Sequence, residues 1–260
     1  MTLAALPDLA RIPAGDFLMG AADADEDERP VHRVYVSEFL IGRFPVTNDE
    51  YARFVRDTGY PAPMIRNLPL IATGGRDVQF KEIAGGFAWS AGEPPAGQGS
   101  HPVVLVTLDD ANAYCEWLSA AVGRSVRLPT EAEWEKAARG GVDGSRYPWG
   151  DDMDPVRGHF LSSGEDRRGT RPTGTYPPNG YGLCDMIGNV WEWVTDWYHR
   201  DYYATSETRD PKGPLSGTLR IVRGGSWVND DAAMLRCAYR HKVPPDTYAY
   251  SIGFRVVCES

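Results

Sequence analysis

The sequence predicts an α+β fold with low regular secondary structure, built as a single domain over residues 1–260. The chain contains 28 glycines and 20 prolines, a high share that is typical of many turns and long irregular loops. Helical patterns occupy only a few short segments, and short strands separate them. Hydrophobic residues make up 42% of the chain, which suffices for one large core and excludes overall disorder.

The first third of the chain combines short strands with one helix. Residues 17–41 read as strands around an acidic loop at residues 23–28. Thr47 and Glu50 form a capping-box pattern that predicts a helix to about Arg56, ended at Gly59. We expect residues 60–100, which are rich in Gly and Pro, to form a long loop with at most one hairpin.

The remaining elements follow from shorter patterns. Residues 101–106 are apolar and predict a short buried strand before a helix at 109–122. Thr130 and Glu133 form a second capping box, so we expect another helix, ended at Gly140. Further strands are predicted at residues 190–197, 219–222 and 252–257.

Charge and hydropathy exclude several classes of partner. The net charge of −9 argues against a nucleic-acid ligand, because no basic surface is available to neutralise phosphates. No segment approaches the roughly 20 apolar residues of a membrane span, so we expect no membrane partner. The N-terminal residues show no basic leader, and we therefore expect no signal peptide and a cytoplasmic location.

Common catalytic and metal-binding motifs are absent. We find no nucleophile elbow, phosphate-binding loop, dinucleotide fingerprint or zinc-protease motif. The four cysteines, at positions 115, 184, 237 and 258, form no CxxC pair, which excludes a structural zinc cluster. Their spacing is compatible both with free thiols and with one or two disulfides.

Two short motifs stand out. In residues 185–193 (DMIGNVWEW), a strand would place Glu192 on the face opposite Trp191 and Trp193. Asp185 precedes Glu192 by seven residues, with a turn at Gly188 between them, which suits an oxygen-only Ca²⁺ site. The alternative is a buried Glu paired with an Arg. In residues 223–227 (RGGSW), the two glycines permit either close backbone approach to a ligand or a tight turn that seats Trp227 in the core.

Eight ordered motifs resemble one family over nearly the whole chain. The sequence is similar to the formylglycine-generating enzymes, also called sulfatase-modifying factors. The resemblance implies a formylglycine-generating-enzyme-like variant of the C-type lectin fold. The motifs lie at residues 12–20, 45–48, 127–136, 147–150, 179–183, 188–193, 223–227 and 253–255.

The resemblance also implies what this chain lacks. Family members with the founding activity oxidise a sulfatase cysteine, using O₂ and a copper ion held by two cysteines. Here the first cysteine position is Asn229, and the second falls between Asp231 and Met234. Cys237 matches a different, structural family cysteine, whose partner position is Ala138. Soft Cu(I) requires thiolate ligands of that kind, so copper on two cysteines is not expected here.

The calcium positions of the family transfer better. The resemblance implies a structural Ca²⁺ held by the carboxylates of Asp185 and Glu192 and by the backbone carbonyls of Gly188 and Val190. For a second family calcium site, only Asp166 matches a ligand. Cys115 and Cys258 match, or nearly match, a family disulfide that would form in an oxidising compartment.

Three functions remain open. The chain is an atypical oxidative enzyme acting on a peptide or small metabolite with a redox metal of unknown identity, a lectin-like protein that binds a peptide, protein or small molecule, or a catalytically silent relative that binds peptide. Retroelement-diversified lectins vary the segment that corresponds to residues 228–251. The candidate ligand-binding residues are Trp227, Asn229, Asp231, Tyr239, Arg240, His241, Tyr248 and Tyr250.

Overall fold

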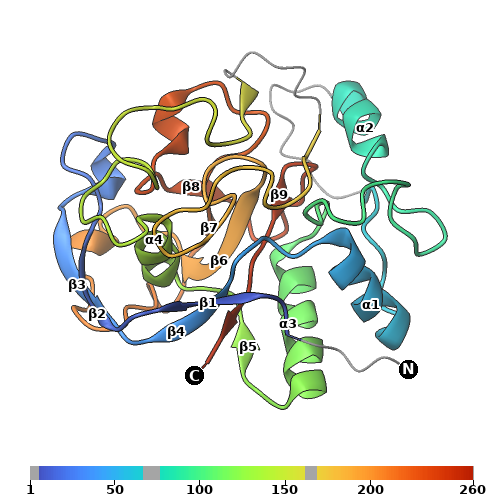
Figure 1. Cartoon of the computed structure of the whole chain (residues 1–260), viewed down its shortest axis with the longest axis horizontal. Coiled ribbons are helices and arrows are strands. Elements are labelled where there is room, and N and C mark those ends of the chain that lie inside the picture. Colours follow the sequence, from blue (N-terminus) through green and yellow to red (C-terminus); the bar gives the residue numbers. More distant parts are fainter. Residues whose placement is uncertain (1–5, 67–76, 162–168, 260) are drawn as a thin grey trace.

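The computed structural model describes residues 6–66, 77–161 and 169–259 and has the α+β architecture predicted from the sequence. One four-stranded antiparallel sheet has the order β1-β4-β10-β5 (Figure 1). It combines β1 (Leu9–Ile12), β4 (Phe39–Gly42), β10 (Val257–Cys258) and β5 (Val126–Arg127). Strands distant in sequence therefore meet in one sheet, and β10 occupies an interior position.

A second sheet, of order β8-β7-β6-β9, forms the centre of the molecule (Figure 1). It consists of β8 (His241–Val243), β7 (Arg220–Arg223), β6 (Trp191–Trp197) and β9 (Ile252–Gly253). Strands β6 and β9 pair in parallel, whereas the other pairs are antiparallel. The sequence expectations for residues 190–197 and 219–222 agree with β6 and β7, while the expected strand at 252–257 is divided between β9 and β10.

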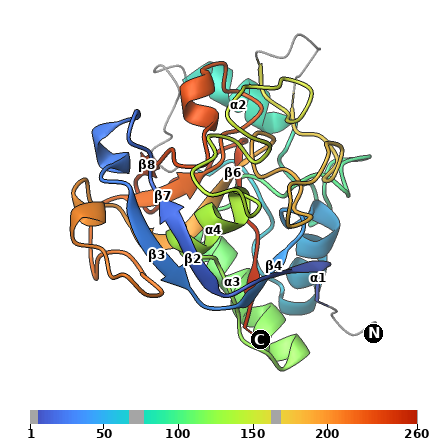
Figure 2. The same cartoon turned by 60° about the vertical axis from the view of Figure 1, so that its left-hand side comes forward.

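The acidic loop lies between the strands of a separate hairpin. Strands β2 (Gly15–Met19) and β3 (His32–Val36) pair in antiparallel register, and the 3-10 turn η1 (Glu26–Glu28) lies in the loop that joins them. The hairpin packs against helix α4, as the rotated view shows (Figure 2). This arrangement brings the acidic loop close to the second sheet.

Three of the helices begin with capping boxes; those at Thr47 and Thr130 were expected from the sequence, and the one at Thr107 was not. Helices α1 (Asn48–Thr58), α3 (Leu108–Val122) and α4 (Glu131–Ala138) each have a threonine N-cap in a complete capping box. Helices α1 and α3 end at Gly59 and Gly123, both in the left-handed conformation. Two further 3-10 turns are η3 (Tyr202–Ala204) and η4 (Ala232–Leu235).

Two expectations were wrong. Residues 101–106 form no strand, although 102–106 are buried, because Leu105 has a positive φ of 61° and the segment makes only an isolated bridge between Pro102 and Thr47. Within residues 60–100, where only a loop was expected, the structure contains helix α2 (Asp77–Gly85). The hairpin expected there is reduced to an isolated bridge between Ser90 and Glu93.

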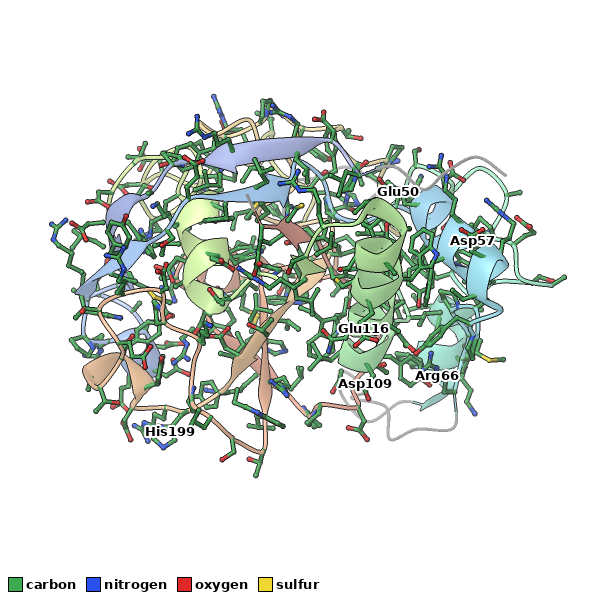
Figure 3. All side chains as sticks on the ribbon, turned by 90° about the horizontal axis from the view of Figure 1, so that it is seen from below. Glu50, Asp57, Arg66, Asp109, Glu116 and His199 are labelled. Atoms are coloured by element: carbon green, nitrogen blue, oxygen red, sulfur yellow. The ribbon has the colours of Figure 1, made fainter. Side chains whose placement is uncertain are left out.

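The main core lies between α1, α3 and the two four-stranded sheets, and a second cluster fills the space between the β2–β3 hairpin and α4. The outer sides of α1 and α3 carry acidic side chains, among them Asp57, Asp109 and Glu116 (Figure 3). In the described part of the chain, none of the helices combines the length and the apolar character needed for a transmembrane segment.

Candidate functional site

The turn before β6 holds the residues expected to bind calcium. Asp185, Gly188 and Asn189 all have positive φ angles, of 58°, 83° and 61°. A Cβ atom at position 188 would lie 2.5 Å from the carbonyl oxygen of His159, so only glycine fits there. Asp185, Gly188, Val190 and Glu192 are all buried, which places the two carboxylates inside the protein.

Glu192 is bound on both carboxylate oxygens. Arg255 donates from Nε to Oε2 at 2.6 Å and from Nη2 to Oε1 at 2.7 Å, and Trp134 Nε1 donates to Oε2 at 2.7 Å. The buried Glu–Arg pair considered from the sequence is therefore formed. Trp134 and Arg255 were not assigned to this site from the sequence, although both lie in motifs shared with the family.

Asp185 has fewer hydrogen-bond partners than Glu192. The backbone N–H of Gly174 donates to its Oδ2 at 2.8 Å. Burial raises the pKa of Asp185 to about 6, and the negative charge of Glu192 acts in the same direction. Asp166, the candidate for a second calcium site, lies outside the described residues.

The family resemblance assigns the two copper cysteines to Asn229 and to a position within residues 231–234. In the structure, Asn229 Nδ2 lies 3.4 Å from the sulfur of Met234, a residue of that range. The Oδ1 atom of Asn229 accepts hydrogen bonds from the backbone N–H and the hydroxyl of Ser226, each at 2.8 Å. An amide and a thioether are not the thiolate pair that Cu(I) requires, so the copper site of the family does not fit these residues.

Half of the candidate ligand-binding residues are buried. Trp227, Tyr248 and Tyr250 pack in an aromatic cluster with Phe80 and Phe87. The tight-turn interpretation of residues 223–227 is thus the one observed, because Gly224 and Gly225 have φ angles of 95° and 74° and Trp227 is in the core. These side chains offer little area to a ligand.

The other candidates remain accessible. Asn229, Tyr239 and His241 are partly exposed and Asp231 is exposed. His241 stacks on Trp191 with ring centroids 4.8 Å apart, and Tyr239 extends the stack at 6.4 Å from His241. Burial lowers the pKa of His241, and the neighbouring Lys242 lowers it further, so the imidazole is neutral at pH 7. We call Asn229, Asp231, Met234, Tyr239 and His241 the upper patch.

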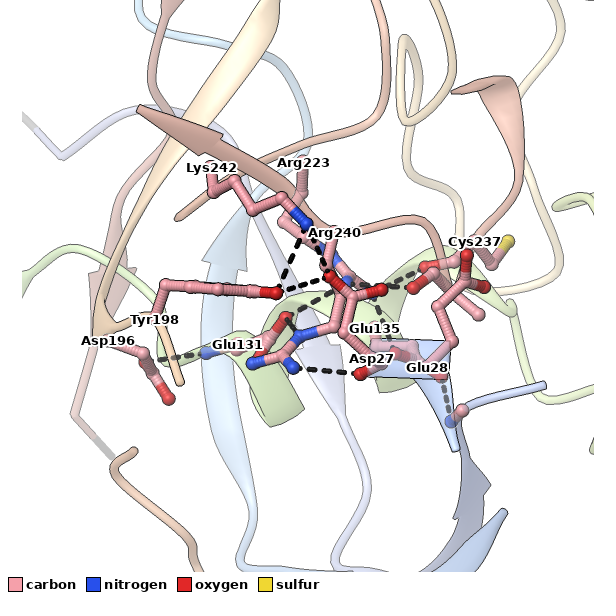
Figure 4. Close-up of polar contacts among 12 residues, drawn as sticks. Asp27, Glu28, Glu131, Glu135, Asp196, Tyr198, Arg223, Cys237, Arg240 and Lys242 are labelled. Atoms are coloured by element: carbon pink, nitrogen blue, oxygen red, sulfur yellow. Dashed lines mark hydrogen bonds and ion pairs between the residues drawn. The ribbon is translucent and has the colours of Figure 1, made fainter. Parts of the chain in front are cut away.

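Arg240, next to His241 in the chain, belongs to a buried charged network (Figure 4). Its guanidinium donates to both carboxylate oxygens of Glu131, at 2.8 and 3.0 Å, and to the backbone carbonyl of Asp27. Arg223 donates to Glu131 and Glu135 at 2.9 and 2.6 Å. Arg240 is therefore committed to the interior and cannot serve as a wall of a ligand groove.

An acidic cluster lies beside this network, and it was not predicted from the sequence as a site. Ligand atoms of Asp25, Asp27 and Glu28 are within 4.8 Å of one another. Glu28 is paired with Arg236 and Asp27 with Lys242, while Tyr198 also donates to Asp27 (Figure 4). The acidic loop at residues 23–28 was the available sequence signal, but which of its carboxylates converge depends on the hairpin.

All four cysteines are buried free thiols. Cys115 and Cys258 lie in the same core cluster without a disulfide between them. Burial raises the pKa of Cys115 and of Cys237 to about 12, so both are protonated and poorly nucleophilic at neutral pH.

Comparison with known proteins defines the class to which this fold and site belong. The sulfatase-modifying factor enzyme 1-like domain matches residues 2–260, and the chain therefore belongs to the formylglycine-generating enzyme family. It is 38% identical to the formylglycine-generating enzyme of Thermomonospora curvata, covering 96% of this chain and 93% of the relative.

Other relatives carry different names. The chain is 35% identical to the inactive C-alpha-formylglycine-generating enzyme 2 of Mus musculus, covering 96% of this chain and 85% of that protein. It is also 39% identical to a serine/threonine-protein kinase, pkn1, of Chlamydia pneumoniae, where the match covers 96% of this chain but 38% of the kinase.

Two solved structures share the fold. PvdO from Pseudomonas aeruginosa aligns with a TM-score of 0.81 and 28% identity over all of both chains. Variable protein 1 of Treponema denticola aligns with a TM-score of 0.76 and 25% identity, covering 97% of this chain and 95% of that one. The α+β architecture of the formylglycine-generating-enzyme-like fold is thus established for this chain.

Proposed function

We propose that this chain is a non-catalytic member of the family that binds a peptide segment of another protein at the upper patch. The observation that carries the proposal is Asn229, at the position that the resemblance assigns to the first copper cysteine, in contact with Met234 rather than with a cysteine. These residues preserve a packed turn there but supply no thiolate. The relative named as inactive indicates that the family includes members without the founding activity.

The chemistry of the upper patch supports peptide binding. The partly exposed rings of Tyr239 and His241 present flat contact area, and Asn229 and Asp231 in the same segment carry accessible polar side chains. Tyrosine with small polar residues is typical of adaptable binding surfaces.

The alternative is an oxidative enzyme acting on a peptide or small metabolite. Such an enzyme needs a redox centre. Within the described residues, the only group of three or more His, Cys, Asp or Glu side chains close enough to share an ion is Asp25, Asp27 and Glu28. All three are hard oxygen donors, and Asp27 and Glu28 are already engaged in ion pairs, which favours the binding role over the oxidative one.

The proposal is tested with a fluorescent cysteine-containing peptide patterned on a sulfatase active-site segment. We expect binding in fluorescence anisotropy and no change of peptide mass after incubation with Cu(I) and O₂. Tyr239→Ala and His241→Ala should weaken binding about tenfold, whereas Asp246→Ala, an exposed position in the same segment, should not. Absence of binding would contradict the peptide assignment. Conversion of the cysteine to formylglycine, or peptide-dependent oxygen uptake, would contradict the non-catalytic assignment.

We also propose that a structural Ca²⁺ binds between Asp185 and Glu192, with the carbonyls of Gly188 and Val190 as further ligands. Two buried carboxylates here face one buried guanidinium, that of Arg255, so the described groups carry one excess negative charge. Oxygen ligands of this kind suit Ca²⁺. The ion would fix the turn before β6, and Trp191 of β6 stacks on His241 of the upper patch.

Thermal unfolding in CaCl₂ and in EGTA tests the calcium proposal. We expect the wild type to unfold several degrees lower in EGTA and Asp185→Ala and Glu192→Ala to lose that difference. Asp57→Ala, an exposed carboxylate on α1, is the control and should keep it. If the wild type has the same Tm in both buffers after chelation, the calcium proposal is wrong and the Glu192–Arg255 pair is stable without a metal.

A further inference from the structure

A cavity of about 470 Å³ lies at a different place from the upper patch. The loop after α4, the loop after β2 and residues 236–238 surround it, and none of the upper-patch residues lines it. Its floor is made by the buried residues Arg139, Ser145 and Arg236. Its volume is in the range of small-molecule sites rather than of macromolecular interfaces.

The two arginines of the floor are fixed from behind. Arg139 donates to Glu135, to the carbonyl of Gly20 at 2.8 Å and to the carbonyl of Ser145 at 2.6 Å. Arg236 donates to both oxygens of Glu28, at 2.6 and 2.7 Å, and from Nε to the carbonyl of Ala233. A guanidinium has five N–H groups. Within the described chain, these bonds use four N–H groups of Arg139 and three N–H groups of Arg236. The remaining N–H groups belong to rigidly held side chains and can donate to a ligand.

Ser145 supplies an independent sign of a ligand. Its side chain is 4% exposed and lines the cavity. In the described part of the chain its hydroxyl has no hydrogen-bond partner. Buried hydroxyls are normally satisfied, so this group is expected to be paired when the cavity is filled.

The rim of the cavity has the opposite chemistry. Asp23, Asp151 and Asp152 are exposed there and face a single exposed cation, Arg146. Arg146 pairs with Asp23, and its backbone N–H donates to Asp151 at 3.0 Å. The rim is therefore acidic, with carboxylates that can accept from a cationic group. The floor charges are already balanced by Glu135 and Glu28.

We propose that this cavity binds a small zwitterion of the α-amino-acid type. The carboxylate of the ligand accepts from Arg139, Arg236 and the Ser145 hydroxyl on the floor. Its ammonium group lies against Asp151 and Asp152 at the rim. The N–H donors of the floor and the carboxylates of the rim match the two charges of such a molecule. A simple anion would be repelled by the acidic rim, and a simple cation would be repelled by the arginines of the floor.

The test starts with thermal-shift screening of the twenty L-amino acids and continues by calorimetry on the one that stabilises most. We expect a dissociation constant in the micromolar to millimolar range. The N-acetyl derivative, which lacks the ammonium, and the amide derivative, which lacks the carboxylate, should each bind at least about tenfold more weakly. Ser145→Ala and Asp152→Asn should weaken the parent compound about five- to tenfold.

Asp57→Asn is the matched control for Asp152→Asn, since both positions are exposed carboxylates, and it should bind as the wild type does. Asp152 lies on the surface, so we expect Asp152→Asn to fold normally, and it tests the proposal even if Ser145→Ala fails to fold. The proposal is wrong if none of the amino acids binds, if either derivative binds as well as its parent, or if Asp152→Asn binds unchanged.

Discussion

At the scale of single residues, the family resemblance assigns the copper cysteines to Asn229 and to a position within residues 231–234, and this chain has no cysteine at any of them. Asn229 and Met234, a residue of that range, are in contact. The first position follows from the resemblance, because Asn229 lies two residues after the RGGSW motif. The second could not be named from the sequence, since the chain makes the short turn η4 there and only the fold shows which side chain returns to Asn229.

This contact predicts that copper binding can be restored. In the double variant Asn229→Cys/Met234→Cys we expect one tightly bound Cu(I), because the two side chains are already close enough to share an ion and thiolates suit it. Competition with a Cu(I)-specific chromogenic chelator measures the affinity.

The single variant Asn229→Cys is the control and should bind Cu(I) orders of magnitude more weakly. Equal affinities for the single and double variants would mean that position 234 does not face position 229 in solution.

At the scale of secondary-structure elements, two kinds of signal made helices predictable. The capping boxes at Thr47 and Thr130 predicted α1 and α4, and a regular apolar face predicted α3. In the structure Thr47, Thr107 and Thr130 each accept from the backbone N–H three residues on. Helix α2 has no such box described at its start and was missed. Residues 101–106 were misassigned because an apolar run identifies burial but does not specify pairing.

The turn after β7 shows how strongly an element can depend on one glycine. Gly224 and Gly123 both have positive φ, but a Cβ at 224 would lie 2.8 Å from the carbonyl of Met186 and 3.0 Å from the Trp134 ring. A Cβ atom at position 123 would have no atom within 4 Å apart from those of its neighbours in the chain. We expect Gly123→Ala to cost about 1 kcal/mol of unfolding free energy through backbone strain alone.

Gly224→Ala adds a clash inside the core to the same strain, and we expect it to cost at least about 3 kcal/mol. Urea denaturation of both variants measures the difference. Equal losses would indicate that the RGGSW turn can relax away from Trp134.

At the scale of the whole molecule, charge is concentrated inside as well as on the surface. Arg223, Arg240, Glu131 and Glu135 are all nearly inaccessible and bind one another. Composition predicted the acidic net charge and the large core. It could not predict this network, because its members come from α4, β7 and the segment before β8 and meet only in the folded chain.

Asp196 makes the stability of this interior depend on pH. Burial raises its pKa to about 7, and the charge of Glu131 adds to the effect. An aspartate in the unfolded chain titrates near 4. Between about pH 4 and pH 7 the folded state therefore binds more protons than the unfolded state, so the contribution of Asp196 to stability falls as the pH rises through this window.

Asp196→Asn should remove this contribution while keeping an oxygen for the N–H of Glu131, which donates to Asp196 at 2.8 Å. We expect the Tm of the variant relative to wild type to increase from pH 5 to pH 8. Other carboxylates, such as Glu135, have lowered pKa values and act in the opposite direction, and the difference between the two proteins cancels them. A Tm difference that is constant with pH would show that Asp196 titrates normally.

The sheet of order β1-β4-β10-β5 has a consequence for biosynthesis. Strand β4 is complete at Gly42, but its partner β10 is not synthesised until residue 258. At 5–20 residues per second, the ribosome needs about 10 to 40 s to make the intervening chain. Throughout that interval β4 has an unpaired edge, so the nascent chain depends on protection from aggregation until translation has passed β10.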